Sequence, residues 1–212
     1  LVGTNARDYA VAAGWSARVV GPFSDGLVRI NNAVVSGTAP SAAAGAAAGA
    51  PSKLAPHAYV NRSHSGPYGI VNSEEGYQNL VRFLFGDIRV DGVLEVAAIT
   101  LPDSIQAMKK AGRQVRASYH FEAVTAVRGT HWDLSRRLAS ENSTVFRRYG
   151  ELFPETPQPG DRAGHASPEL FTTFLSSGAR VDQSRASLGF SADLGVLVPE
   201  YEVDGALFLK DH

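Results

Sequence analysis

The 212-residue chain contains no cysteine, which excludes disulfide bonds, thiolate metal sites and a cysteine nucleophile. No apolar run comes near the ~20 residues that a membrane-spanning helix needs, so no transmembrane segment is expected. The formal net charge is only −1, whereas binding to nucleic acid or to an anionic membrane needs a concentrated positive field. The composition is otherwise that of a soluble globular protein. It leaves the compartment open, with the cytoplasm slightly favoured.

Several motifs that carry chemistry are also missing. No grouping of His, Asp or Glu has the spacing of a zinc site such as H-E-x-x-H, and no P-loop or dinucleotide-binding glycine pattern occurs. We therefore expect neither a metal nor a cofactor. The G-x-S-x-G turn that presents a nucleophilic serine is absent too, because the nearest string, Gly14–Arg18, lacks the second glycine.

One amphipathic helix is predicted from residue 73 onward. Ser73 is a good N-cap, and Glu74 and Glu75 suit the positive end of a helix dipole. Gly86 is placed to end the helix. Five apolar residues recur at helical spacing and predict a stripe that packs against a sheet: Tyr77, Leu80, Val81, Leu84 and Phe85.

Beyond residue 88 the hydrophobic pattern changes to period two, which is typical of half-buried strands. Strands are predicted over 115–123, 170–175, 188–198 and 201–209, with a short helix within 103–112 and turns at Asp91-Gly92 and Asp204-Gly205. Residues 88–212 are therefore expected to form a mostly antiparallel, β-sandwich-like domain. This domain would follow an α/β domain over residues 1–87.

Two features concern the continuity of the chain. The segment 36–55 is rich in Ala, Gly, Ser and Pro and has no hydrophobic period, so it is interpreted as a flexible surface insertion. The run Leu1–Thr4 has the sequence pattern of the last residues of a β-strand, whose first residues would precede Leu1. We therefore expect the chain to be a piece of a longer protein.

Two short polar loops are candidates for a catalytic pair. Asp25 stands in a tight Ser-Asp-Gly turn before an apolar stretch, and His64 stands in a flexible Ser/Gly-rich loop before the predicted helix. A serine hydrolase needs a histidine to take the serine proton and a carboxylate to orient that histidine. In the α/β-hydrolase fold the chain order is serine, acid, histidine, with a helix after the histidine. Asp25, His64 and the predicted helix follow that order.

The runs Ser24–Val28 and Arg62–Gly66, the second leading to Ile70–Ser73, resemble the acid and histidine loops of lipase-like serine α/β-hydrolases. The run Glu75–Gly86 resembles the closing helix of that family, so the resemblance covers residues 1 to about 86. It implies a partial α/β-hydrolase sheet in this part of the chain. The β-rich remainder resembles accessory domains that are appended to some of these hydrolases.

The resemblance also implies roles for individual residues. By it, Asp25 is the triad acid and His64 the general base of a lipase or carboxylesterase, and the substrate is a small-molecule or lipid-like carboxylic ester. The nucleophilic serine and the oxyanion hole would lie upstream of Leu1, and the isolated chain would be inactive. The chemistry requires no cofactor.

Rival interpretations stay open. His57 is a second candidate base and Asp8 a second candidate acid, and Asp25 is also a residue type that simply stabilises turns. A different class of function is a non-enzymatic binding module, in which the β domain recognises lipid, glycan or protein. The candidate contact residues of this β domain are the aromatic residues Trp132, Tyr149 and Phe153. Core packing is the favoured interpretation of these three residues.

Overall fold

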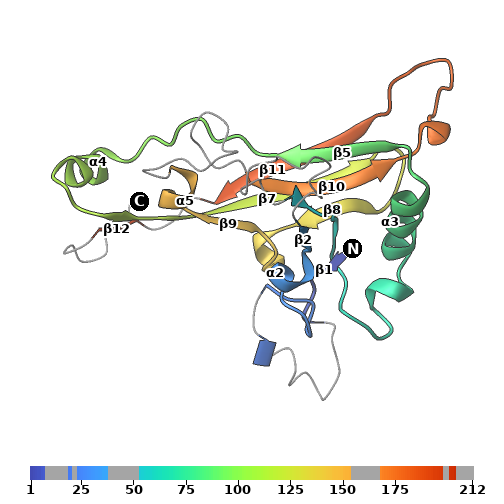
Figure 1. Ribbon diagram of the computed structural model, residues 1–212, viewed down its shortest axis with the longest axis horizontal. Helices are drawn as coiled ribbons and strands as arrows, with labels where there is room; N and C mark the ends of the chain where they lie inside the picture. The colour runs from blue at the N-terminus through green and yellow to red at the C-terminus, as the bar shows by residue number, and fades with distance from the viewer. Residues whose placement is uncertain (8–18, 21–22, 38–52, 154–167, 198–200, 204–212) are drawn as a thin grey trace, which may run out of the picture.

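Figure 1 shows the computed structural model, which describes residues 1–7, 19–20, 23–37, 53–153, 168–197 and 201–203. In that part of the chain, helices and strands are mixed, and the sheets are small and mostly antiparallel. Most strands run along one elongated body, and the first elements of the chain lie on one side of it (Figure 1). The described part of the chain thus contains the expected mixture of helices and strands.

One strand pair is parallel. Strand β1 (Val2–Gly3) pairs with β4 (Tyr59–Val60), and the two strands match residue for residue. A parallel pair needs a long connection, which the residues between the two strands supply. The first residue of each strand is buried with Ile30 of the short helix α2 (Ile30–Ala33) in a small apolar cluster. This cluster holds the parallel pair together from one side.

The predicted insertion 36–55 begins and ends in paired strands. Strand β2 (Ser36–Gly37) pairs antiparallel with β3 (Lys53–Leu54), and Ala55 N donates to Val35 O at 2.7 Å beside them. The described ends of this segment are therefore paired strands, and the assignment of the segment as an insertion stays a prediction. Residues 38–52 lie outside the described residues, and their flexibility stays a prediction.

Residues from 88 onward form antiparallel sheets around one long central strand. Strand β7 (Ser118–Val127) pairs with β11 (Phe190–Leu197) on one side and with β8 (Asp133–Arg137) and β9 (Val145–Arg148) on the other. Two further pairs are β5 (Ile88–Val93) with β10 (Glu169–Leu175) and β6 (Val115–Arg116) with β12 (Glu202–Val203). The helices are α4 (Asp103–Lys110), which was expected, and the short α5 (Tyr149–Leu152).

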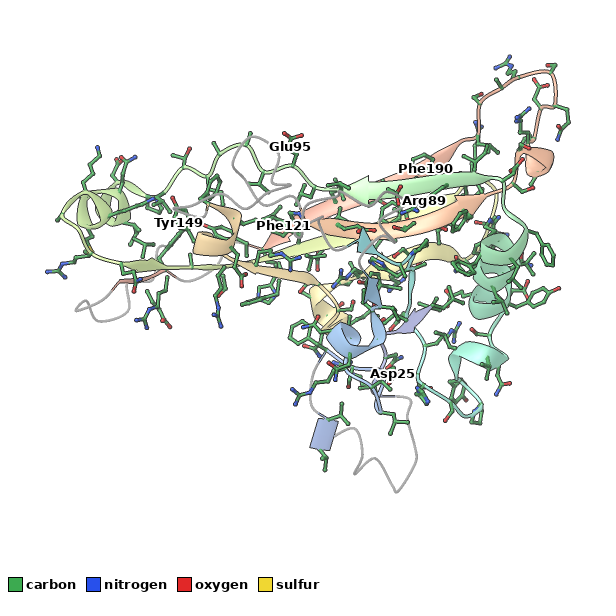
Figure 2. All side chains as sticks on the ribbon, viewed as in Figure 1. Asp25, Arg89, Glu95, Phe121, Tyr149 and Phe190 are labelled. Carbon is green, nitrogen blue, oxygen red and sulfur yellow. The ribbon has the colours of Figure 1, made fainter. Side chains whose placement is uncertain are left out.

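The period-two prediction of a half-buried strand is confirmed for β7 but is wrong for β11, which is exposed along almost its whole length. Along β7, buried and partly exposed residues alternate, with Tyr119, Phe121 and Ala123 facing inward. They form one apolar cluster with Leu170 and Phe171 of β10, and Figure 2 shows Phe121 inside the elongated body. Apolar burial contributes roughly 25 cal/mol per Å², so this cluster is the main source of stability in the β-rich part.

The turn predicted at Asp91-Gly92 is wrong. Both residues lie within β5 and pair with β10, whose register shifts between Glu169 and Phe171. A side chain at Gly92 would collide with the ring of Phe171. The glycine therefore permits a close approach of two strands and does not form a turn. Asp204-Gly205 lies outside the described residues.

Helix α3 (Glu74–Phe85) begins and ends where the sequence predicts. The Ser73 hydroxyl accepts from Gly76 N at 3.0 Å, and Gly86 N donates to Arg82 O at 2.7 Å. The predicted packing face is wrong, because most of the apolar stripe is exposed. The exposed stripe residues are Tyr77, Leu80, Leu84 and Phe85.

The buried face of α3 is small and polar. Gly76 and Asn79 are its buried residues, and Asn79 Nδ2 donates to Asp133 O of β8 at 3.1 Å. The Phe83 ring meets the edge of the Phe174 ring of β10 with 5.6 Å between centroids. The helix therefore packs on the β-rich part of the chain through a side that the hydrophobic pattern does not indicate.

Further hydrogen bonds join the first elements to the β-rich part. Tyr59 N donates to the Ser135 hydroxyl at 3.2 Å, and Thr172 N donates to His57 O at 2.7 Å. Strand β4 is consequently placed against β8 and β10. The division into domains 1–87 and 88–212 stays a prediction, and the two stretches share a hydrogen-bonded contact.

Candidate catalytic pair

The two predicted catalytic residues lie on the chain segments that leave β1 and β4. Asn5 N donates to Arg62 O at 3.2 Å, so the two segments stay side by side beyond the strands. The carboxyl ends of parallel strands meet at one edge of the sheet, where α/β proteins usually place their sites. Figure 2 shows Asp25 among the first elements, well away from Tyr149 of the elongated body.

Asp25 is held by the turn in which it stands. Its Oδ1 accepts from Leu27 N at 3.0 Å and from Val28 N at 2.7 Å, and the residue is only 6% exposed. The turn needs a left-handed backbone at Gly26, with φ of 96°, and also at Phe23, with φ of 59°. The carboxylate is thus fixed by backbone amides before any histidine contacts it.

The His64 loop is cross-linked by its own hydrogen bonds. The Ser63 hydroxyl donates to Ser65 O at 3.0 Å and lies 3.3 Å from Tyr68 O, and Asn72 Nδ2 donates to Gly66 O at 2.7 Å. Ser63 is fully buried. Serine and asparagine side chains thus satisfy backbone carbonyls of this loop, and its flexibility stays a prediction.

The structure brings Asp25 and His64 together. The His64 Nδ1 atom lies 3.0 Å from Asp25 Oδ2, and His64 N donates to Asp25 O, also at 3.0 Å. A carboxylate only accepts hydrogen bonds, so Nδ1 donates in this contact. The carboxylate side chain is 9% exposed and the imidazole 41% exposed. The arrangement is a partly exposed imidazole that is oriented by a buried carboxylate.

Gly3 is a supporting residue that the sequence does not reveal. A Cβ atom at this position would lie 2.8 Å from Asp25 Cβ and 2.8 Å from Arg62 O. Only glycine therefore lets the end of β1 pass behind the acid. Its role depends on a contact between residues far apart in the chain, so no local signal in the sequence could have found it.

The histidine loop is also tied to helix α3. Arg62 Nε donates to Glu75 Oε2 at 3.0 Å, and both side chains are partly buried. Glu75 was expected to favour the helix dipole, and it additionally anchors the residue two positions before His64. A charge-assisted hydrogen bond of this kind limits the motion of the loop relative to the helix.

The rival candidates are placed differently. His57 is 6% exposed, its Nδ1 donates to Ala55 O at 2.9 Å, and its ring edge meets Tyr59 at 5.3 Å between centroids. It therefore has the environment of a packed histidine, and its Nδ1 also lies 4.0 Å from Glu169 Oε1. Asp8 lies outside the described residues, as does the Gly14–Arg18 string.

The aromatic residues of the binding-module hypothesis do not form one exposed cluster. Tyr149 and Phe153 are partly buried against the β-rich core, with 5.4 Å between their ring centroids. Trp132 is partly buried under the guanidinium of Arg82 at 4.2 Å. The favoured interpretation as packing residues agrees with these surroundings, although Tyr149 and Phe153 also line a cavity of about 1230 Å³ beside α5 and β6.

Within the described ranges, no three His, Cys, Asp or Glu side chains lie together in a way that could hold a metal ion. None of the helices described is both long and apolar enough to cross a membrane. Comparison of the chain with protein-family models, with curated proteins and with solved structures finds no match. The geometry of the Asp25–His64 pair is therefore the basis on which a function can be argued.

Proposed function

We propose that Asp25 and His64 are the acid and the base of a serine ester hydrolase of the lipase or carboxylesterase type. The observation that carries the proposal is the 3.0 Å contact between His64 Nδ1 and Asp25 Oδ2, together with the buried anchoring of the carboxylate. The proposal also includes the finer fold assignment, in which residues 1–87 contribute part of an α/β-hydrolase sheet. The parallel β1–β4 pair and the chain order of acid, histidine and helix support that assignment.

The proposed roles follow from the hydrogen bonds. Asp25 keeps the Nδ1 proton of His64 in place, so Nε2 can accept the proton of a serine hydroxyl. The serine oxygen then attacks the ester carbonyl, and the imidazolium returns the proton to the departing alcohol. Water, deprotonated in the same way, hydrolyses the acyl-enzyme and releases the carboxylic acid.

The serine itself is proposed to lie before residue 1. The full sequence contains no G-x-S-x-G string, and the family order places the nucleophile upstream of the acid. The isolated chain supplies the acid and the base but neither the nucleophile nor the oxyanion donors. The substrate class, a carboxylic ester and by resemblance a lipid-like one, belongs to the whole enzyme.

The test is ester hydrolysis by the full-length parent protein and by its His64→Ala variant. Loss of the base should lower kcat by about three orders of magnitude or more, with a smaller effect on KM. Asp25→Asn should have a similar effect, because an amide at this position favours the wrong tautomer of the ring. His131→Ala, at an exposed histidine of the β-rich part, is the matched control and should keep full activity.

A loss of less than about tenfold in the His64→Ala variant would assign the base to another residue. The nucleophile is tested separately with a fluorophosphonate probe. We expect labelling of the full-length protein at one upstream serine and no labelling of the isolated chain. Labelling of the isolated 212 residues would refute the upstream placement.

A further inference from the structure

A second polar site lies where the first elements meet the β-rich part. A cavity of about 620 Å³ opens between α2 and strands β4, β8 and β9. Neither Asp25 nor His64 lines it, so the site is separate from the proposed catalytic pair. Its volume is within the range of pockets that hold small organic ligands.

One wall of the cavity carries a buried and unneutralised cation. Arg137 is 7% exposed, and its guanidinium donates through Nε to Ser143 O at 2.7 Å and through Nη2 to Thr144 O at 3.1 Å. It also stacks on the Tyr59 ring at 4.1 Å. These contacts, which are its contacts in the described part of the chain, include no carboxylate. Nη1 is therefore available for an acceptor in the cavity.

Two further groups reach the same wall. Tyr59 is 4% exposed and lines the cavity, and its hydroxyl makes no hydrogen bond with the residues described. Burial lowers the pKa of Arg137, Tyr59 opposes that shift and the nearby Arg147 adds to it, so the three groups interact. Arg147 also lines the cavity and is partly exposed. The Glu169 carboxylate also lines the cavity, but it forms no ion pair with Arg137 among the described contacts. A buried charge that is not paired is costly, and an anion bound at Arg137 would relieve that cost.

The side of the cavity formed by α2 and the residues around it is mixed. Phe23, Ile30 and Val34 supply its apolar part, and Arg29 and Asn31 also line it. Glu169 stands on the polar side and accepts a hydrogen bond from the Thr172 hydroxyl. This carboxylate would repel a ligand with a second negative charge. The combination favours a ligand with one anionic end and one apolar end.

We infer that this cavity binds an apolar chain that ends in a carboxylate. The carboxylate would accept hydrogen bonds from Arg137 Nη1 and from the Tyr59 hydroxyl, with Arg147 as a second cation. The apolar chain would lie along the wall of Phe23, Ile30 and Val34. The inference does not rest on the catalytic role of Asp25 and His64.

The test is a calorimetric titration of the 212-residue chain with decanoate. Decanol has the same chain without the charge, and acetate has the charge without the chain, so both should bind at least about tenfold more weakly. Decyl phosphate should also bind more weakly than decanoate, because of its second charge. Tighter binding of decyl phosphate, or equal binding of decanol, would overturn the inference.

Two variants and one control test the polar wall without removing the deeply buried Arg137. Tyr59→Phe deletes only the hydroxyl and should weaken decanoate binding roughly tenfold, as the loss of a hydrogen bond to a charged group does. Arg147→Gln should weaken it several-fold. Arg148→Gln, at the exposed neighbour on β9 that does not line this cavity, is the matched control.

Unchanged affinity in both Tyr59→Phe and Arg147→Gln would overturn the inference, and so would an equal loss in the Arg148→Gln control. The titration is repeated with Asp25→Asn, which should retain decanoate binding. This last variant separates the cavity from the proposed catalytic pair. A negative result in the ester hydrolysis test would not contradict decanoate binding in the cavity. Absence of decanoate binding would likewise not contradict the proposed catalytic pair.

Discussion

At the scale of single residues, the acid of the proposed pair depends on a glycine that lies far from it in the chain. A Cβ at Gly3 would lie 3.3 Å from Asp25 Oδ2 as well as 2.8 Å from Asp25 Cβ. The smallest possible substitution there must therefore move the carboxylate or the β1 backbone. A substitution at Gly3 therefore tests directly whether the β1 backbone supports the Asp25–His64 pair.

Gly3→Ala should destabilise the chain by roughly 1–3 kcal/mol, as the insertion of a methyl group into filled space does. It should also weaken the downfield proton resonance of the His64 Nδ1–H group, because the Asp25 acceptor is displaced. Chemical denaturation and one-dimensional proton spectra measure the two effects. Gly150→Ala is the control, since a Cβ there meets no atom within 4 Å. Equal stability of the two variants would contradict the proposed support.

The sequence was sufficient to predict Asp25 and His64 as partners, because both stand in loops whose order along the chain is informative. It was not sufficient for Gly3 or for the buried Ser63 hydroxyl. Glycine at the end of a strand and serine before a histidine are common, and their value here comes from contacts across the fold. Such contacts have no local pattern.

At the scale of elements, α3 shows that the limits of a helix and its packing face are determined by different interactions. Capping by Ser73 and Gly86 fixed the limits of the helix, and those limits are correct. The orientation is not, because Gly76 allows the helix to approach Ile70 O closely and Asn79 finds a carbonyl of β8. Local capping chemistry is readable from sequence, whereas the choice of packing face is decided by the partner.

This orientation reverses two expectations for substitutions in α3. Gly76→Ala should raise stability on helix propensity alone, but the added Cβ meets the Ile70 carbonyl and should lower stability by more than about 1 kcal/mol. Leu80→Ala should cost about 2–5 kcal/mol if the apolar stripe were core. With Leu80 at 47% exposure, we expect about 0.5 kcal/mol or less in the isolated chain. Urea unfolding of both variants measures these changes, and the opposite ranking would contradict the observed orientation.

At the scale of the whole molecule, the first elements and the β-rich part share hydrogen bonds in buried or partly buried positions. Besides the Tyr59–Ser135 bond, Asn61 Nδ2 donates to Glu141 Oε1 at 3.0 Å, and Thr172 N donates to His57 O. Breaking the contact would leave several polar groups without partners, and each such group costs about 1–3 kcal/mol. Composition and periodicity divide the chain near residue 88, yet they carry no information about this contact.

We therefore expect the chain to unfold as one cooperative unit. Native-state hydrogen exchange should give similar opening free energies for the Thr4 amide, which donates to Val60 O at 3.0 Å, and for the central amides of β7. Calorimetric and van't Hoff enthalpies should also agree. A Thr4 amide that opens at several kcal/mol below the amides of β7 would show instead that the first elements unfold independently.

The unequal exposure of Asp25 and His64 determines how protons reach the pair. The carboxylate side chain is 9% exposed and is enclosed by the turn that holds it, whereas the imidazole side chain is 41% exposed. In the proposed reaction, solvent and the serine hydroxyl therefore both approach the pair from the imidazole side, and exclusion of water from that side would favour proton transfer over hydration.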